Sequence, residues 1–295
     1  MNQDSTRVVV IAVAIAALGG GGFWWWRTHQ PKPAPARPVA AARPPAPSMQ
    51  PVQPIAAPPP PAAPAIRHPL TKADGSGLPA LDQADGFLRS RLQDLLGRKA
   101  VQSFLVSEGL VRKVVATVDN LGRDHAPSAM WPVVPTSGRF VAQPAKAGGG
   151  SVIGASNHER YTPFVAVATS VDAQRVVGLY RRIYPLLQQA YEDLGYPGKY
   201  FNDRVVDVID DLLRTPEPTA PVAVKAVEIP GAEGAVKAGG LYMFEDPALE
   251  ARPLGQKILL RMGKSNAARV KAKLAEVRRL IATDFSAGVL GDRGK

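Results

Sequence analysis

The residues with the clearest chemical pattern are Gly263, Lys264 and Ser265, which precede the last expected helix. They match the end of a P-loop, whose backbone amides and lysine surround nucleotide phosphates. That motif also needs a glycine where this chain has Ile258, and the residues KILLRM before Gly263 have a helical pattern, so a P-loop is rejected. A weaker hypothesis is an anion site formed by Arg261, Lys264 and Ser265 at the helix N-terminus. The alternative is that Ser265 is an ordinary N-cap beside a solvated basic face.

A second group consists of four carboxylates, at Asp203, Asp207, Asp210 and Asp211, spaced by about one turn on one expected helix. They could hold a cation or supply a general acid and base. A solvated helix face is the better interpretation, and Asp203 in the first turn also suits the helix dipole.

The remaining residue types argue against catalysis. Of the histidines, His29 and His68 fall in a linker, while His125 and His158 fall in loops without metal-ligand spacing. The chain has no cysteine, which excludes disulfides, Cys-ligated zinc and thiol chemistry, and no G-x-S-x-G segment. The sequence therefore predicts no catalytic, cofactor-binding or metal-binding residue and a protein that is not an enzyme. An unrecognised enzyme that uses the four aspartates is the further alternative.

Residues 170–216 hold the longest periodic apolar pattern and predict two helices joined by a tight turn. Ser170 is the expected N-cap of the first helix and Asn202 that of the second. Pro185 predicts a kink or a break near residues 181–185. The expected buried positions are Val176, Tyr180, Ile183, Leu187, Tyr191 and Leu194 in the first helix, and Val205, Val206, Ile209, Leu212 and Leu213 in the second.

At these residues the chain resembles a known family. The segment LYRRIYPLLQQAYEDLGYPGKYFNDRVVDVIDDLL is similar to the core of the bacterial domain-of-unknown-function family numbered 3014. The segments LVRKVVATVDNLGRDHAPSAMWPVVP and LYMFEDPALEARPLGQKILLRMGKSNAARVKAKLAEVR, and the N-terminal apolar segment, are similar too. The resemblance spans roughly residues 85–283 and implies no site, because the family has no established activity. An insertion-like stretch at residues 226–240 is expected to lengthen a surface loop.

The rest of the chain predicts a mainly α fold with at most a small β-hairpin. Residues 122–155 have the composition of a long irregular loop, with Trp131 expected to pin it to the core. Ser156 and Glu159 could form a capping box. Further helices are expected over 81–96, around 101–105, and over 109–121, 247–251, 254–262 and 265–281, with a hairpin formed by 222–227 and 241–244.

The N-terminal region predicts a membrane anchor. After a short tail (residues 1–7), residues 8–26 contain no charge and are long enough for one transmembrane helix, with a cleavable signal peptide as the alternative. Residues 27–77 are rich in Pro and Ala and predict a disordered linker, or alternatively a proline-motif ligand for a partner. A helical domain is expected over 78–283 and a frayed tail over 284–295.

The orientation of this anchor is ambiguous. Only Arg7 precedes the span, while Arg27, Lys32, Arg37 and Arg43 come after it, and this count favours a cytoplasmic domain. A single N-terminal anchor of a bacterial protein usually exports the domain on its C-terminal side. We therefore expect a single-pass protein of the bacterial inner membrane with a periplasmic domain.

The net charge of +11 could favour anionic partners, although residues 1–70 alone hold six Lys/Arg and one acidic residue. The expected function is a non-enzymatic envelope interaction or scaffolding module. Its expected partners are the inner membrane and an envelope protein or anionic polymer, and nucleic acid is not expected. The alternative is binding of an anionic polymer or lipid headgroup through the basic last helix, which carries Arg269, Lys271, Lys273, Arg278 and Arg279.

Overall fold

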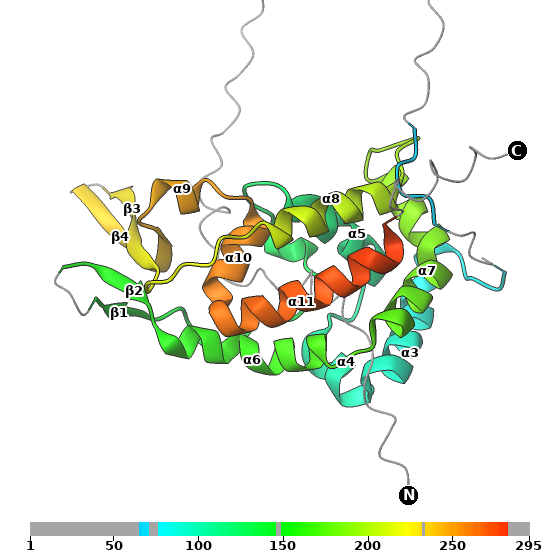
Figure 1. Cartoon of the computed structure of the whole chain (residues 1–295), viewed down its shortest axis with the longest axis horizontal. Coiled ribbons are helices and arrows are strands. Elements are labelled where there is room, and N and C mark those ends of the chain that lie inside the picture. Colours follow the sequence, from blue (N-terminus) through cyan, green and yellow to red (C-terminus); the bar gives the residue numbers. More distant parts are fainter. Residues whose placement is uncertain (1–64, 71–75, 146–148, 232–233, 283–295) are drawn as a thin grey trace, which may run out of the picture.

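The computed structural model describes residues 65–70, 76–145, 149–231 and 234–282 (Figure 1). The expected tail 1–7, transmembrane helix 8–26 and C-terminal tail 284–295 lie outside the described residues, as does most of the expected linker 27–77. Within the described ranges, no helix combines the length and the apolar character needed to cross a bilayer.

Helices form most of the described chain, which confirms the mainly helical prediction. In Figure 1, α11 runs through the middle of the molecule, and it contacts α6, α7, α8 and α10. The helices are η1 (Leu81–Gln83), α3 (Ala84–Leu96), α4 (Arg98–Phe104), α5 (Leu110–Leu121), η2 (Ser128–Met130), α6 (Ala155–Thr169), α7 (Ala173–Asp193), α8 (Phe201–Leu213), α9 (Pro247–Glu250), α10 (Leu254–Met262) and α11 (Lys264–Ile281).

Most of the predicted stripe positions of α7 and α8 are buried, and Tyr180 and Leu213 are partly buried. Leu194 was predicted to be buried but is 39% exposed, because α7 ends at Asp193.

The start of α7 also differs from the prediction. The N-cap is Asp172, whose side chain accepts from the backbone amides of Gln174 and Arg175, whereas Ser170 ends α6. Of the kink or break predicted near residues 181–185, the break is wrong, because α7 continues through Pro185. The proline costs one backbone hydrogen bond, which the burial of the surrounding turns in the core offsets.

The β structure is larger than the predicted hairpin. Four antiparallel strands pair in the order β1 (Ala142–Pro144), β2 (Ser151–Ile153), β3 (Ala223–Gly231) and β4 (Gly234–Phe244). The stretch 226–240 thus contributes to both arms of the hairpin rather than to a loop, because the antiparallel pairing continues from Glu228 and Lys237 to Gly231 and Gly234. The irregular region 122–155 supplies β1 and β2, and Trp131 within it is buried as expected.

The start of α6 corrects a second capping prediction. The helix begins at Ala155 after Gly154, and no capping box forms at Ser156 and Glu159. The Asn157 side chain instead accepts from the Val141 amide at 2.9 Å, and it donates to the Val141 carbonyl. The helix start is therefore fixed by the neighbouring β1 segment rather than by its own first turn.

Residues 65–70, which we call the strap, lie within the predicted linker yet contact the start of α8. The backbone amides of Arg67 and His68 donate to the two carboxylate oxygens of Asp203, at 3.0 and 2.8 Å. The Leu70 amide donates to the Tyr200 hydroxyl at 3.0 Å. The folded part of the chain therefore includes a segment that precedes residue 78.

Asn202 joins the strap to the rest of the fold. It is fully buried, at 0% exposure, and lies inside the first turn of α8 rather than at the predicted N-cap. Its amide nitrogen donates to the carbonyls of His68 and Ile281, at 2.8 and 3.0 Å. Its amide oxygen accepts from the Tyr180 hydroxyl at 3.0 Å. One side chain thus connects the strap, α7, α8 and the end of α11.

Replacing Asn202 with alanine should destabilise the protein by about 2–4 kcal/mol, because two carbonyls and a hydroxyl would lose a buried partner. Urea unfolding of the full chain, followed by circular dichroism, measures this change. The control is Asn120→Ala on α5, where the side chain donates to the Ala116 carbonyl of its own helix and to the Met130 sulfur, which is a weak acceptor. Equal stability of the two variants would contradict the role of Asn202.

Candidate functional site

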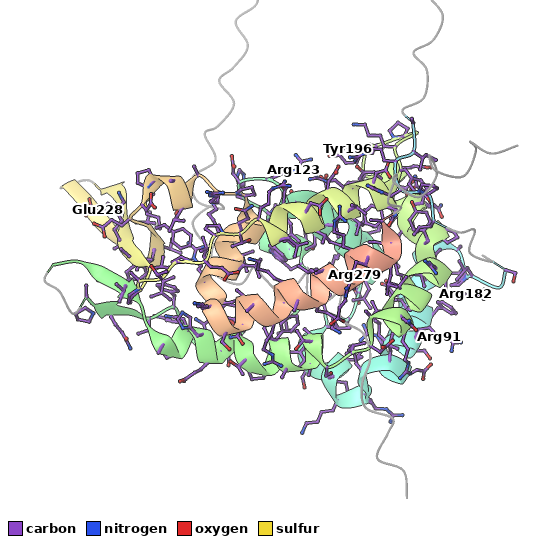
Figure 2. All side chains as sticks on the ribbon, in the orientation of Figure 1. Arg91, Arg123, Arg182, Tyr196, Glu228 and Arg279 are labelled. Carbon is purple, nitrogen blue, oxygen red and sulfur yellow. The ribbon has the colours of Figure 1, made fainter. Side chains whose placement is uncertain are left out.

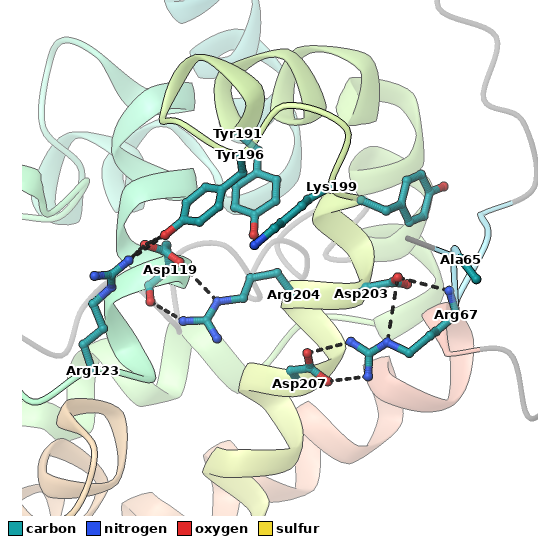
Figure 3. A pocket seen from close by; sticks show the side chains of 11 residues that line it. Ala65, Arg67, Asp119, Arg123, Tyr191, Tyr196, Lys199, Asp203, Arg204 and Asp207 are labelled. Carbon is teal, nitrogen blue, oxygen red and sulfur yellow. Dashed lines mark hydrogen bonds and ion pairs between the residues drawn. The ribbon is translucent and has the colours of Figure 1, made fainter. Parts of the chain in front are cut away.

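A pocket of about 480 Å³ lies above the first half of α8, between the strap, the end of α5 and the turn that joins α7 to α8 (Figure 3). This volume is in the usual range for ligand-binding pockets. In Figure 3, Arg67 and Arg123 lie at opposite ends of the pocket. The lining residues are Ala65, Arg67, Asp119, Arg123, Tyr191, Tyr196, Lys199, Tyr200, Asp203, Arg204 and Asp207.

Two stacked tyrosines form one wall of the pocket. Tyr191 is buried on α7, and Tyr196 lies in the turn after it, with ring centroids 4.6 Å apart and planes at 20°. The turn places Tyr196 because Gly195 adopts a positive φ of 109°, which lets the chain reverse directly after α7. The Lys199 ammonium lies 5.3 Å from the centre of the Tyr196 ring, within cation–π range.

One end of the pocket is built on the carboxylate of Asp119, whose side chain is only 7% exposed. Arg123 donates to it at 2.7 Å, and the Tyr196 hydroxyl donates to it at 3.0 Å. Arg204 forms an ion pair with it at 3.3 Å. The hydrogen bond to Asp119 raises the pKa of Arg123, and burial raises the pKa of the Tyr191 hydroxyl. Asp119 therefore positions the side chains that reach into the pocket.

The other end is closed by Arg67 of the strap. Its guanidinium donates to both carboxylate oxygens of Asp207, at 3.0 and 2.6 Å. Asp203, one turn earlier, accepts the two strap amides. The hydrogen bond to Asp207 raises the pKa of Arg67 above its usual value. These two carboxylates hold the strap in place and leave the guanidinium little capacity for a ligand.

Two cationic side chains of the pocket, Lys199 and Arg123, have hydrogen-bond donors that are available to a ligand. The lining contains four cationic and three acidic side chains, so one positive charge is in excess. Among the described residues, no carboxylate forms an ion pair with Lys199. Arg123 is 52% exposed, and its contacts with Asp119 and Tyr196 both use Nη2. Together, Lys199 and Arg123 beside the tyrosine rings offer hydrogen-bond donors next to a flat apolar surface.

The predicted row of carboxylates on α8 is divided between two surfaces. Asp203 and Asp207 line the pocket, whereas Asp210 pairs with Arg278 and Asp211 with Arg214. The expected solvated face is thus only partly correct, because every carboxylate of the row has a partner within the protein. In the parts of the chain that the structure describes, no group of three or more acidic or histidine side chains could hold a metal ion.

The structure separates the roles of the predicted anion-binding residues. Arg261 is partly buried and donates to the Tyr242 carbonyl at 3.1 Å, with its guanidinium 4.8 Å from the centre of the Phe244 ring. Burial lowers the pKa of Arg261. Lys264 and Ser265 are in the first turn of α11, whose N-cap is Gly263 rather than Ser265. An anion site formed by these three residues stays a prediction.

The basic side chains of α11 are mostly used inside the protein. Lys271 donates to Glu217 at 2.7 Å, Lys273 pairs with Glu276, and Arg269 donates to the Thr169 hydroxyl at 3.0 Å. Arg278 in turn pairs with Asp210. Much of the positive charge that the sequence analysis considered available for an anionic polymer is therefore paired within the protein.

Sequence reasoning missed the pocket because its residues come from distant parts of the chain. Arg67 and Asp207 are 140 residues apart, and Tyr196 and Asp119 are 77 apart. Figure 2 shows Arg123 and Tyr196 at the same edge of the molecule. The one local signal is the turn GYPGKY, in which two tyrosines and a lysine surround the glycines.

The model of one protein family, described as a protein of unknown function (DUF3014), matches residues 110–278 of the chain. The match includes Asp119, Arg123, Tyr196, Lys199 and the pocket face of α8, while the strap lies outside it. No curated protein and no solved structure matches the chain.

Replacing Asp203 with alanine should release the strap. Asp203 is 14% exposed and accepts hydrogen bonds from two strap amides. Hydrogen bonds to a charged group contribute about 1.5 kcal/mol or more. Without them the strap should open more often, and trypsin should cleave after Arg67 about tenfold faster. Mass spectrometry of the fragment that begins at His68 gives the rate. Asp211→Ala on the same helix is the control, because the Asp211 carboxylate pairs with Arg214 and with no strap residue among those described. Unchanged cleavage in the Asp203 variant would show that the strap is not held there.

Proposed function

The chain belongs to DUF3014, a family of proteins of unknown function, and we propose that it is a membrane-anchored interaction module rather than an enzyme. Its binding site is the pocket above α8, and its ligand is an extended acidic segment of an envelope protein. The observation that carries the proposal is the pair of incompletely used cations, Lys199 and Arg123, beside the stacked tyrosines.

The partners of the pocket carboxylates favour binding over catalysis. A general base must offer a lone pair to the proton that it removes. Asp119 is surrounded by two arginines and a tyrosine hydroxyl, and Asp203 and Asp207 are occupied by the strap. Each carboxylate therefore acts as a structural anchor for a side chain or a segment that borders the ligand.

The composition of the pocket supports an acidic, extended ligand. A carboxylate placed between Lys199 and Arg123 would gain charge-assisted hydrogen bonds, which are about twice as strong as neutral ones. The ring of Tyr196, held in place by stacking on the buried Tyr191, would cover the apolar part of the same ligand, since tyrosine offers a large rigid contact area. The exposed lysine and arginine also suit a partner that associates by electrostatic attraction.

The N-terminal sequence supports a place at the bacterial inner membrane. Residues 8–26 would anchor the chain, and residues 27–64 could extend on the order of 100 Å as a Pro-rich spacer. The domain would then search the periplasm for its partner within that radius. A module of this kind needs no cofactor and no metal ion.

Photo-crosslinking in a bacterial host tests the binding site. A photoreactive residue at Pro197, exposed in the turn beside Tyr196, should form an adduct with a partner protein. The double variant Arg123→Ala/Lys199→Ala should reduce that adduct about tenfold, because both cations that meet the ligand are lost. The control, Arg91→Ala/Lys99→Ala, removes the same charge from α3 and α4, and Figure 2 shows Arg91 well away from Arg123. Equal adducts in both variants would contradict the proposal.

Alkaline phosphatase fused after Lys295 tests the orientation of the anchor. The fusion should be active, because this enzyme needs an exported environment and the proposal places the domain in the periplasm. Immunoblotting confirms that the fusion is intact. A stable but inactive fusion would place the domain in the cytoplasm, as the Lys/Arg count around the anchor suggests.

A further inference from the structure

We infer that the segment immediately before the strap, residues 58–64 with the sequence PPPPAAP, docks in the pocket and competes there with the partner protein. The inference rests on the proposed binding site and adds a regulator to it: the linker of the chain itself covers the site until an acidic segment displaces it.

The path of the chain is the first argument. Ala65, the first described residue, itself lines the pocket, and the next residues are fixed on α8 by Asp203 and Asp207. The chain therefore enters the described structure at one end of the pocket. In Figure 3 that end lies opposite Arg123, with the tyrosines and Lys199 between them. A segment that precedes Ala65 needs only to continue along the pocket to cover these residues.

The chemistry of the segment is the second argument. Consecutive prolines favour polyproline II, a conformation whose backbone carbonyls have no internal hydrogen-bond partners. Grooves lined by aromatic side chains recognise such segments. Here Tyr196, stacked on the buried Tyr191, provides the aromatic surface, and Lys199 and Arg123 provide donors for the free carbonyls. Residues 58–64 contain no charge, so they would occupy the cations without neutralising them.

The covalent connection makes even a weak contact significant. A short flexible tether gives an effective concentration on the order of millimolar, so an interaction with a Kd of about 0.1 mM would cover the pocket about 90% of the time. A partner would then bind about tenfold more weakly than to an open pocket, because it must first displace the segment. An acidic partner has an advantage over the uncharged segment, since it alone brings a negative charge to Lys199 and Arg123.

Disulfide trapping in the full chain tests this inference, and the chain has no native cysteine to interfere. One cysteine replaces Asp124, which is exposed beside Arg123 at the far end of the pocket. The other replaces Ala62, Pro60 or Ala57, which lie about 9, 16 and 25 Å from Ala65 along a polyproline II segment. We expect an intramolecular disulfide between the cysteine at position 124 and the cysteine in the linker. Its rate of formation should differ among the three linker positions, because a docked segment places one of them nearest to position 124.

The matched control replaces the remaining prolines of residues 58–61 with glycine, which keeps the tether length and removes the preformed conformation. Crosslinking should then slow by about fivefold or more if docking depends on polyproline II. A rate that is unchanged or higher would mean that the segment is merely near the pocket, and it would overturn the inference. No disulfide at any position, or a disulfide only between two copies of the chain, would overturn it as well.

The two proposals fail separately. If the disulfide is absent but the photo-adduct at Pro197 still depends on Arg123 and Lys199, the pocket binds a partner and the linker does not cover it. If the disulfide forms and depends on the prolines while no adduct appears, the segment is the occupant and the proposed function is wrong.

Discussion

The hydrogen bonds of the buried Asn202 amide are the constraint on which this structure depends. A buried amide must find partners for both its donors and its acceptor, because leaving one unpaired costs on the order of 1–3 kcal/mol. Asn202 meets this demand by joining the strap, α7 and the last carbonyl of α11. Since successive residues of a helix point in different directions, burying Asn202 turns Asp203 and Arg204 of the same turn toward the pocket. The interior of the fold thus decides which side of α8 the pocket uses.

The charges of the pocket result from this arrangement. Asp119 holds two arginines and a tyrosine, and Asp203 and Asp207 hold the strap, so the acidic groups are used for structure. A pair of cations next to aromatic rings remains for a ligand, which is a binding surface rather than a reactive centre. The strap has a second consequence, because the same contacts that close one end of the pocket bring the Pro-rich linker to it. We therefore propose that the linker to the membrane anchor and the ligand-binding surface meet at this pocket.

Local patterns predicted the features that depend on neighbouring residues, and little else. The stripes of α7 and α8 were predictable from periodicity, because helical packing buries every third or fourth residue. The N-caps at Ser170 and Asn202 were wrong, since Asp172 offers a carboxylate two residues later and Asn202 is needed in the core. The strap was hidden within a composition typical of disorder, although Arg67 and His68 differ from the Pro/Ala residues around them. The pocket required contacts across 77 to 140 residues, which no single-sequence pattern reports.

The most direct test of the central claim, that residues 65–70 belong to the folded domain through Asn202 and α8, is amide hydrogen exchange in the full chain. The amides of His68 and Leu70 donate to Asp203 and Tyr200, and they should exchange at rates comparable to those of amides within α8. Because the strap and α8 would open together, conditions that expose one should expose the other. Exchange of these two amides at the rate of an unstructured peptide, while α8 stays protected, would contradict the account.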